Sequence, residues 1–364
     1  GWVELFSDFC DPGAEQKEDL QSGSEAAAAG GYTDVCLVPS NHPPTTNKAS
    51  VDYLKSKSEL VQLHPIGAVS KQLEGKDLAE MYDMKAAGAI AFSDGVYPIQ
   101  SAGLMAKALQ YIKSFHGVIL QIPDDKSISQ FGYMHEGTVS TKLGLQGIPS
   151  IAETIFLKRD IDILQYTKSA LHITGISTKE SVALIRQAKK QGLHISCSVT
   201  PAHLLYNDTI LETYDSCYKI HPPLRTEADH LALIKGVEDG TIDCIAAHHF
   251  PQDWDSKETE FAYAKNGMIQ LQTTLPALLQ VSTKISIDRW VEMLTLHPRQ
   301  ILGLPSIRIE EKEKACLTVF DTNTKWELND ATNKSKSKNS PFYHQTLQGK
   351  IIAVVNNHRY DKKK

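Results

Sequence analysis

The stretch Thr241–Gln252, TIDCIAAHHFPQ, carries the clearest structural signal in this sequence. Its apolar run Ile242–Ala247 is too short for a helix and predicts a buried strand. His248 and His249 follow at once, and Pro251 then ends any ladder because proline has no N–H to donate. Polar side chains at the end of a buried parallel strand are where a β/α barrel carries its chemistry. The stretch therefore predicts a barrel strand with two histidines at its mouth.

Seven more apolar runs of similar length precede this one and alternate with helical patterns. Segment 177–191, for example, places Val182, Ile185 and Ala188 on one helical face, and Gly192 follows at the C-cap position. Segments 100–115 and 225–237 have similar character. Eight strands that are each followed by a helix predict an eight-stranded parallel β/α (TIM-type) barrel over residues 1–304. The seven earlier runs are Val3–Phe6, Thr33–Val38, Val61–Val69, Ala89–Phe92, Gly117–Ile122, Ala170–Thr174 and His194–Val199.

The pattern changes after Leu304, and residues 305–364 are predicted to form a small β annex. Segments 315–320 and 350–355 have strand character, and the polar stretch between them contains SKSKNS at 335–340, which we expect to be a flexible insert. Residues 361–364 are expected to be a solvated tail. At the other end, Gly1 begins directly in a strand and is not a methionine, so we expect upstream residues to have been removed or left out.

Composition restricts the class of protein. The chain has 364 residues, 41% hydrophobic and 22% charged, with a net charge of −5, so no basic field favours nucleic acid. Its apolar runs fall far short of the roughly 20 residues that cross a bilayer, and no signal segment opens the chain, which predicts a cytoplasmic protein without membrane contact. The 6 cysteines include no C-x-x-C pair and are expected to be reduced packing residues.

Nine motifs in order resemble the dihydroorotases of the amidohydrolase superfamily, specifically the bacterial class associated with aspartate carbamoyltransferase. They run from the first strand to the last predicted barrel strand. The resemblance implies a metal-dependent hydrolase barrel with a small β-sandwich, reversible closure of carbamoyl-aspartate to dihydroorotate, and one or two zinc ions. The motifs are DPG at 11–13, GGYTDVCLVP at 30–39, AGAIAFSDG at 87–95, MHEG at 134–137, GIPSIAET at 147–154, ISTKES at 176–181, VTPAHLL at 199–205, YKIHPPLR at 218–225 and DGTIDCIA at 239–246.

The resemblance also implies where the metal ligands should lie, and most of those positions have changed. Phenylalanine and glycine offer no ligand atom, and glutamine is a poor zinc ligand beside imidazole or carboxylate. Losing one ligand could be compensated, whereas losing four or more could not. The altered positions are Phe6 and Asp8 for the first-strand His-x-His, Asp94 for an aspartate pair, Gln121 for the fifth-strand histidine and Gly175 for the sixth-strand ligand.

Positions that the resemblance assigns to the substrate have changed as well, which removes orientation in addition to activation. His248 stands where the family has its proton-shuttling aspartate, while its neighbour His249 is kept. The substrate positions are Cys10 for an arginine, Ser40 for an asparagine, His221 for a second asparagine and Gln252 for a histidine.

These residues have competing interpretations. Asp8, Asp94, His248 and His249 could form a residual metal site. Adjacent residues on a strand point to opposite faces, so the two histidines could share an ion only if the strand has already ended, which favours separate polar groups at the barrel mouth. His221 could bind an anion or make one ordinary hydrogen bond. Cys10 could be a nucleophile only with a base nearby, and His172 and His203 are expected to be scaffold histidines.

We therefore predict a dihydroorotase-like pseudoenzyme of pyrimidine biosynthesis that has lost its metal site, holds no cofactor and is a structural partner of aspartate carbamoyltransferase or of itself, as a homo-oligomer. The alternative is an active cyclic-amide hydrolase, converting dihydroorotate to N-carbamoyl-L-aspartate at a rearranged zinc site. A third possibility is a module that senses a pyrimidine precursor without reacting it.

Overall fold

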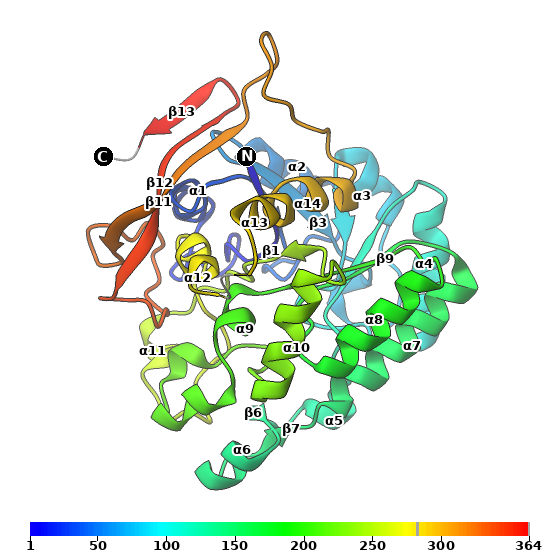
Figure 1. Ribbon diagram of the computed structural model, residues 1–364. Helices are drawn as coiled ribbons and strands as arrows, with labels where there is room; N and C mark the ends of the chain where they lie inside the picture. The colour runs from blue at the N-terminus through cyan, green and yellow to red at the C-terminus, as the bar shows by residue number, and fades with distance from the viewer. Residues whose placement is uncertain (282–283, 363–364) are drawn as a thin grey trace.

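The computed structural model describes residues 1–281 and 284–362, and its main feature is an eight-stranded parallel sheet rolled almost into a barrel (Figure 1). Neighbouring strands follow the order β1-β2-β3-β4-β5-β8-β9-β10. Each predicted run forms one of these strands, which confirms the β/α barrel. The strands are β1 (Trp2–Ser7), β2 (Tyr32–Leu37), β3 (Gln62–Gly67), β4 (Ala91–Phe92), β5 (Ile119–Gln121), β8 (Leu171–Ile173), β9 (Ile195–Val199) and β10 (Cys244–Ile245).

Helices cover the outside of the sheet, and their ends follow local signals. Helix α8 begins after Thr178, whose side chain accepts the N–H of Ser181, and it buries Val182, Ile185 and Ala188 as predicted. Gly192 follows with φ 75°, a conformation that favours glycine. The helices are α1 (Leu20–Ala29), α2 (Lys48–Ser56), α3 (Met81–Ala87), α4 (Ala102–Lys113), α7 (Ile151–Thr167), α8 (Lys179–Lys190), α9 (Pro201–Leu205), α10 (Glu227–Glu238), α11 (Trp254–Lys257), α12 (Thr274–Gln280), α13 (Ile287–Leu294) and α14 (Leu296–Leu302), with 3-10 turns η1 (Lys71–Leu73), η2 (Asp208–Thr213) and η3 (Ser216–Tyr218).

The seam between β1 and β10 is closed mainly by a side chain. The N–H of Asp8 donates to the carbonyl of His249 at 3.0 Å. The buried Glu4 carboxylate accepts the N–H of Ala247 at 2.7 Å and that of His248 at 3.3 Å. Glu4 thus stands in for ladder hydrogen bonds between the first and last strands, and it fixes the backbone on which His248 is carried.

Glu4 should give this seam a pH dependence. Burial raises its pKa from 4.5 to about 7, although three backbone N–H groups oppose the shift. A raised folded-state pKa means that the contribution to stability is complete below the unfolded pKa and is lost as pH rises through the folded one. We expect the free energy of unfolding of the wild type, relative to Glu4→Gln, to fall by about 3 kcal/mol between about pH 5 and pH 8. Urea titrations of both proteins at several pH values measure this difference in the free energy of unfolding. The histidines titrate in both proteins, so their contribution cancels. A difference that does not change with pH would contradict the raised pKa of Glu4.

An arm between β5 and α7 projects from the barrel (Figure 1). It consists of α5 (Lys126–Ser129), β6 (Met134–His135), α6 (Thr138–Leu143) and β7 (Gly147–Ile148), with β6 and β7 paired in parallel. Arg225 fixes its base, because one guanidinium nitrogen donates to the carbonyl of Ile148 at 2.8 Å and lies 3.2 Å from Nδ1 of His135.

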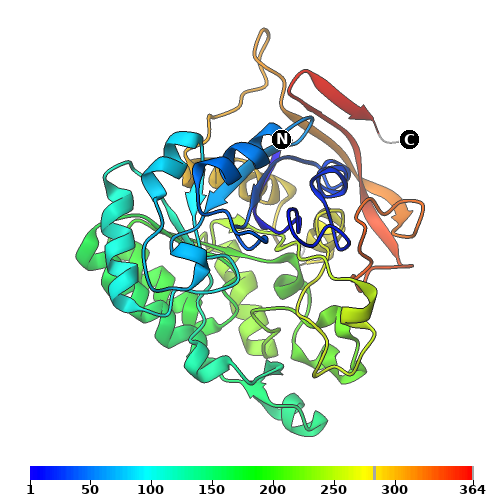
Figure 2. The same cartoon turned by 180° about the vertical axis from the view of Figure 1, so that it is seen from behind.

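The predicted annex is a separate antiparallel sheet of β11 (Leu317–Glu327), β12 (Thr346–Asn356) and β13 (Arg359–Lys362). It lies beside the start of the chain (Figure 2), where the amino group of Gly1 donates to the carbonyl of Cys316 at 2.7 Å. Strand β13 shows that the expected solvated tail was wrong for 361–362, because these residues pair with β12. Residues 363–364 lie outside the described part, and the division at residue 304 stays a prediction.

The segment 335–340 is the largest departure from expectation. It is not a flexible insert, because its polar groups are bound to the barrel mouth. The hydroxyl of Ser335 donates to the Glu18 carboxylate, and that of Ser337 donates to the carbonyl of Lys17 at 2.7 Å. The side chain of Asn339 donates to Phe250 at 3.0 Å and accepts from the N–H of Gln252 at 3.1 Å. The polar composition of the segment indicated a solvated loop. In the folded chain its side chains instead form hydrogen bonds with residues of the barrel mouth.

Two further expectations concern the cysteines and the membrane. All six cysteines are free thiols and five of them are buried, which confirms that they are reduced packing residues. Within residues 1–281 and 284–362, none of the helices combines the length and the apolar character that a membrane span requires.

Candidate functional site

A cavity of about 340 Å³ opens at the barrel mouth, where the carboxyl ends of the strands meet. Its wall is built by loops that follow β1, β5, β9 and β10, so it occupies the place where β/α barrels carry chemistry. The lining residues that matter for its chemistry include Asp8, Ile122, His221, His248, Phe250 and Gln252.

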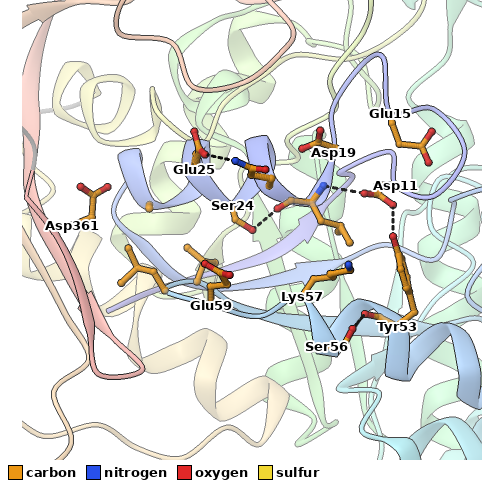
Figure 3. Close-up of a pocket in the computed structure, with 15 residues that line it drawn as sticks. Asp11, Glu15, Asp19, Ser24, Glu25, Tyr53, Ser56, Lys57, Glu59 and Asp361 are labelled. Atoms are coloured by element: carbon orange, nitrogen blue, oxygen red, sulfur yellow. Dashed lines mark hydrogen bonds between the residues drawn. The ribbon is translucent and has the colours of Figure 1, made fainter.

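A larger groove of about 860 Å³ lies outside the barrel, beside α1 and α2 (Figure 3). It is acidic, but its carboxylates already have partners within the chain. Asp11 accepts the hydroxyl of Tyr53 at 3.0 Å and the N–H of Leu20 at 3.3 Å, and Glu25 accepts from the side chain of Gln21 at 3.1 Å. We assign these groups to local structure and place the candidate site at the barrel mouth.

His248 points into the barrel and is the centre of an aromatic plug, which we define as Phe6, His248 and Phe250. Its ring centroid lies 4.9 Å from that of Phe6 and 6.0 Å from that of Phe250. Its Nε2 is 2.7 Å from the hydroxyl of Thr174. Burial lowers the pKa of His248 to about 3, so the imidazole is neutral at physiological pH.

Gly175 shows that the plug fills the space that a side chain at position 175 would need. This residue has φ 73°, and a Cβ added to it would lie 2.8 Å from Cε1 of His248 and 3.2 Å from Cδ of Pro222. A larger side chain therefore has no room while the His248 ring is in place. The glycine at position 175 and the ring of His248 are sterically compatible, whereas a larger side chain at position 175 would clash with that ring.

Asp8 and Asp94, the two acidic residues of the predicted residual cluster, lie in different places and have different hydrogen-bond partners. Asp8 lines the cavity, and its Oδ1 accepts the N–H of Cys10 at 2.7 Å, while burial raises the pKa of the carboxyl. Asp94 instead accepts the N–H groups of Val69 and Ser70, both at 2.9 Å, so it holds the loop after β3.

His249 points away from His248, although neither lies on the strand, because β10 ends at Ile245 and His248 has φ 48°. Its Nε2 lies 3.3 Å from the Glu18 carboxylate, and its Nδ1 accepts the N–H of Gln270 at 3.2 Å. The structure therefore does not gather Asp8, Asp94, His248 and His249 into one cluster. Across residues 1–281 and 284–362, no group of three or more histidine, cysteine, aspartate or glutamate side chains is placed to hold a metal ion.

Comparison with known proteins establishes the family. A family model described as "Dihydro-orotase-like" matches residues 1–181. The dihydroorotase of Caldicellulosiruptor saccharolyticus is 40% identical over 368 residues, covering 100% of this chain and 86% of the relative. That of Acetivibrio thermocellus is 39% identical over 363 residues, covering 98% and 85%. This chain belongs to the dihydroorotase family.

Solved structures support the fold of this dihydroorotase-family chain. The L-hydantoinase (dihydropyrimidinase) of Arthrobacter aurescens matches with a TM-score of 0.89 at 23% identity, over 100% of this chain and 85% of that one. A D-hydantoinase from Bacillus sp. AR9 matches with a TM-score of 0.82 at 17% identity, over 99% and 84%. At such low identities the likeness concerns the fold alone.

Gln121 requires a correction by one residue. Its side chain lies beside Asp160 of α7, on the outside of the barrel, whereas Ile122 lines the cavity. Successive side chains of a strand point to opposite faces, so residue 122 and not 121 faces the mouth. The consequence for metal binding is unchanged, because isoleucine offers no ligand atom at all.

The predicted substrate positions are only partly at the cavity. His221 and Gln252 line it, whereas Cys10 and Ser40 do not. Burial and the neighbouring Asp8 raise the pKa of the Cys10 thiol far above its usual range, which disfavours the nucleophile interpretation. Gln252 accepts from Nζ of Lys17 at 2.9 Å, and the hydroxyl of Ser40 accepts the N–H of Val96 at 3.4 Å.

His172 and His203 are scaffold residues, as predicted. His172 lies between the hydroxyls of Ser196 and Ser198, at 2.9 and 3.1 Å. His203 contacts the hydroxyl of Thr200 at 2.7 Å and the carbonyl of Pro222 at 3.1 Å. Burial lowers their pKa values to about 3 and about 4, so both are neutral members of the hydrogen-bond network.

Sequence reasoning missed the charged group that follows β5. Asp124 lies 3.0 Å from Nε2 of His221 and 2.6 Å from Nζ of Lys126. Both partners keep the pKa of this carboxyl well below its usual range, although burial acts in the opposite direction. The sequence could have indicated Asp124, because charged residues directly after the apolar run 117–122 are expected at the barrel mouth, as His248 is after the run 242–247.

The residues present do not fit the zinc centre that the family implies. Phe6, Ile122 and Gly175 carry no ligand atom, and the neutral imidazole of His248 is held by Thr174 among aromatic rings. Asp94 already accepts two backbone N–H groups away from the cavity. Metal sites require several nitrogen, oxygen or sulfur ligands around one point, and this mouth does not provide them.

Proposed function

We propose that this dihydroorotase-family chain is a non-catalytic member of pyrimidine biosynthesis and a structural partner of aspartate carbamoyltransferase. The observation that supports the first part is the aromatic plug, which leaves no room for a side chain at Gly175, where the motif resemblance implies a metal ligand. The partner comes from the motif resemblance to the bacterial class associated with that enzyme.

The side chains at the mouth support loss of catalysis for a second reason. Hydrolysis of a cyclic amide needs an activated water, a group that polarises the carbonyl and a group that moves the proton. By the motif resemblance His248 stands at the proton-shuttle position, but its pKa of about 3 makes it a weak base and its Nε2 is engaged by Thr174. Under this proposal the barrel scaffold is retained while these chemical requirements are no longer met.

The test of the catalytic part is zinc content together with turnover. Protein purified without a metal-affinity tag should hold close to zero zinc ions per chain by elemental mass spectrometry and should show no dihydroorotate hydrolysis. One or more zinc ions per chain with turnover that His248→Ala abolishes would overturn the proposal. Turnover that neither His248→Ala nor Asp94→Ala changes would identify a contaminating enzyme.

The test of the partner part is affinity purification from the native cell. We expect aspartate carbamoyltransferase to be recovered with this chain, in a ratio that size-exclusion chromatography with light scattering can define. Recovery of the chain alone, as a monomer or homo-oligomer, would contradict the partnership and leave the catalytic part standing.

The second candidate is an active cyclic-amide hydrolase with a rearranged site. The comparisons favour it more directly than the non-catalytic proposal, because relatives named dihydroorotase are 39% and 40% identical over almost the whole chain. The geometry favours the non-catalytic proposal, and the zinc and turnover measurements separate the two.

A further inference from the structure

Helix α7 exposes large apolar side chains on the face that it turns away from the barrel. The helix has 17 residues and lies on the outside of the barrel, with its inner face buried (Figure 1). On the outer face Ile151 is 51% exposed, Ile155 46% and Tyr166 75%. Single exposed apolar residues are ordinary, but several on one face of a helix indicate an interaction surface.

These three side chains belong to a stripe that also contains a lysine and an aspartate. Positions 151, 155, 158, 162 and 166 are three or four residues apart, so they lie one above another on the same face of the helix. Lys158 and Asp162 are exposed and form no ion pair within residues 1–281 and 284–362. Lysine before aspartate is also the less favourable order for pairing within one helix. Both charges are therefore available to a partner outside the chain.

An inverted copy of the same stripe supplies the matching groups. We propose that a second copy of this chain docks on the outward face of α7 about a two-fold axis. With the axis between Lys158 and Asp162, each lysine lies beside the aspartate of the other copy, and two ion pairs form at once. The same arrangement brings Ile155 of one copy near Tyr166 of the other, which removes apolar surface from water. The charges and the apolar groups of the stripe are thus complementary to themselves.

The arm extends this face beyond one helix. A single helix offers little area, since stable interfaces bury about 800 Å² on each partner. Helix α5 of the arm packs against α7, and Phe131, which follows α5, is 63% exposed. The arm projects from the barrel at the end of the molecule where α5 lies (Figure 1), so a second copy seated on α7 also meets the arm.

Sedimentation velocity over a concentration series tests the dimer with the full chain. At about 100 μM chain, a dimer with a micromolar dissociation constant is mostly formed. We expect Ile155→Glu to weaken association at least about 100-fold, because the two-fold axis buries the added carboxylate twice. Leu296→Glu on α14 is the matched control and should leave the dimer unchanged. Leu296 is also 46% exposed, and α14 packs against β1, four strands away from β5.

Charge reversal tests the two ion pairs and separates their loss from misfolding. Lys158→Glu and Asp162→Lys each replace two ion pairs with two like-charge contacts, so each should weaken the dimer about five- to tenfold. The double variant restores both pairs with the charges exchanged. Its association should return to within about threefold of the wild type, because the exchanged order also permits some pairing within each helix.

Three results would each overturn the inference. These are a wild type that is monomeric at about 100 μM, a dimer that Ile155→Glu does not weaken, and a double variant that associates no better than the single ones. If the wild type is monomeric and Ile155→Glu no longer recovers aspartate carbamoyltransferase from the native cell, the face belongs to that enzyme instead. Zinc content and turnover at the barrel mouth do not depend on α7, so the inference goes beyond the proposed function and can fail without it.

Discussion

Replacing Glu153 with alanine will lower the free energy of unfolding by about 3–5 kcal/mol, which is the cost of breaking a buried ion pair by removing one partner. Glu153 lies in the first turn of α7 and is only 1% exposed. Its carboxylate accepts the N–H of Ser177 at 3.0 Å and that of Thr178 at 3.1 Å, and lies 3.7 Å from Nη2 of Arg225. The variant would leave these donors buried and unpaired.

Urea denaturation of the wild type and Glu153→Ala measures the effect. Glu180→Ala is a matched control, because Glu180 is in the first turn of the neighbouring helix α8 and its side chain is 49% exposed. We expect the control to change stability by less than about 0.5 kcal/mol. A similarly small loss for Glu153→Ala would show that this network does not hold the loops around the cavity.

Gly175→Ala should cost about 3 kcal/mol, through two separable causes. The residue has φ 73°, where a Cβ costs about 1–2 kcal/mol, and that Cβ would be forced against the ring of His248 at 2.8 Å. In a His248→Ala background the clash with the ring disappears and only the 3.2 Å contact with Cδ of Pro222 remains, so the cost should fall toward the conformational part of about 1–2 kcal/mol. The double-mutant cycle measures the coupling between the two positions.

Gly192→Ala provides the control for the first cause. Gly192 has φ 75°, and a Cβ there would meet nothing within 4 Å. It should lose only the conformational part, about 1–2 kcal/mol. If Gly175→Ala and Gly192→Ala cost the same, the aromatic plug does not occupy the space at position 175 and the main support for the non-catalytic proposal is lost.

The barrel was predictable because each strand is a short apolar run between polar segments, and because helices such as α8 carry both a cap and a terminal glycine. The opposite directions of His248 and His249 do not follow from strand alternation, because β10 ends at Ile245 and His248 has φ 48°. The directions of Gln121 and Ile122 could not be assigned either, since β5 has only 3 residues and its end cannot be fixed to one position from sequence.

The contacts of segment 335–340 depend on partners that are distant in sequence. Its polar residues have the composition of a solvated loop, and only the folded barrel offers them Glu18 and the carbonyl of Lys17. Local composition carries no information about such contacts, because the groups that satisfy these side chains come from elsewhere in the chain.

The pairing of β13 with β12 is the opposite case. The two strands are joined by a turn of two residues, Asn357 and His358, whose φ values are 50° and 61°. A local hairpin signal was therefore present in the sequence and was overlooked.

The contacts of Glu18 also have a consequence for the order of folding. Its carboxylate is buried by Ser335 and by the N–H of Lys336, which are 317 and 318 residues further along the chain. Contacts at such separation form late, because closing a long loop costs entropy before any contact is gained. On the ribosome β1 emerges before residues 335–336, and Glu18 stays hydrated until this later segment has been made. The mouth of the barrel is therefore sealed only after all eight barrel strands have been synthesised.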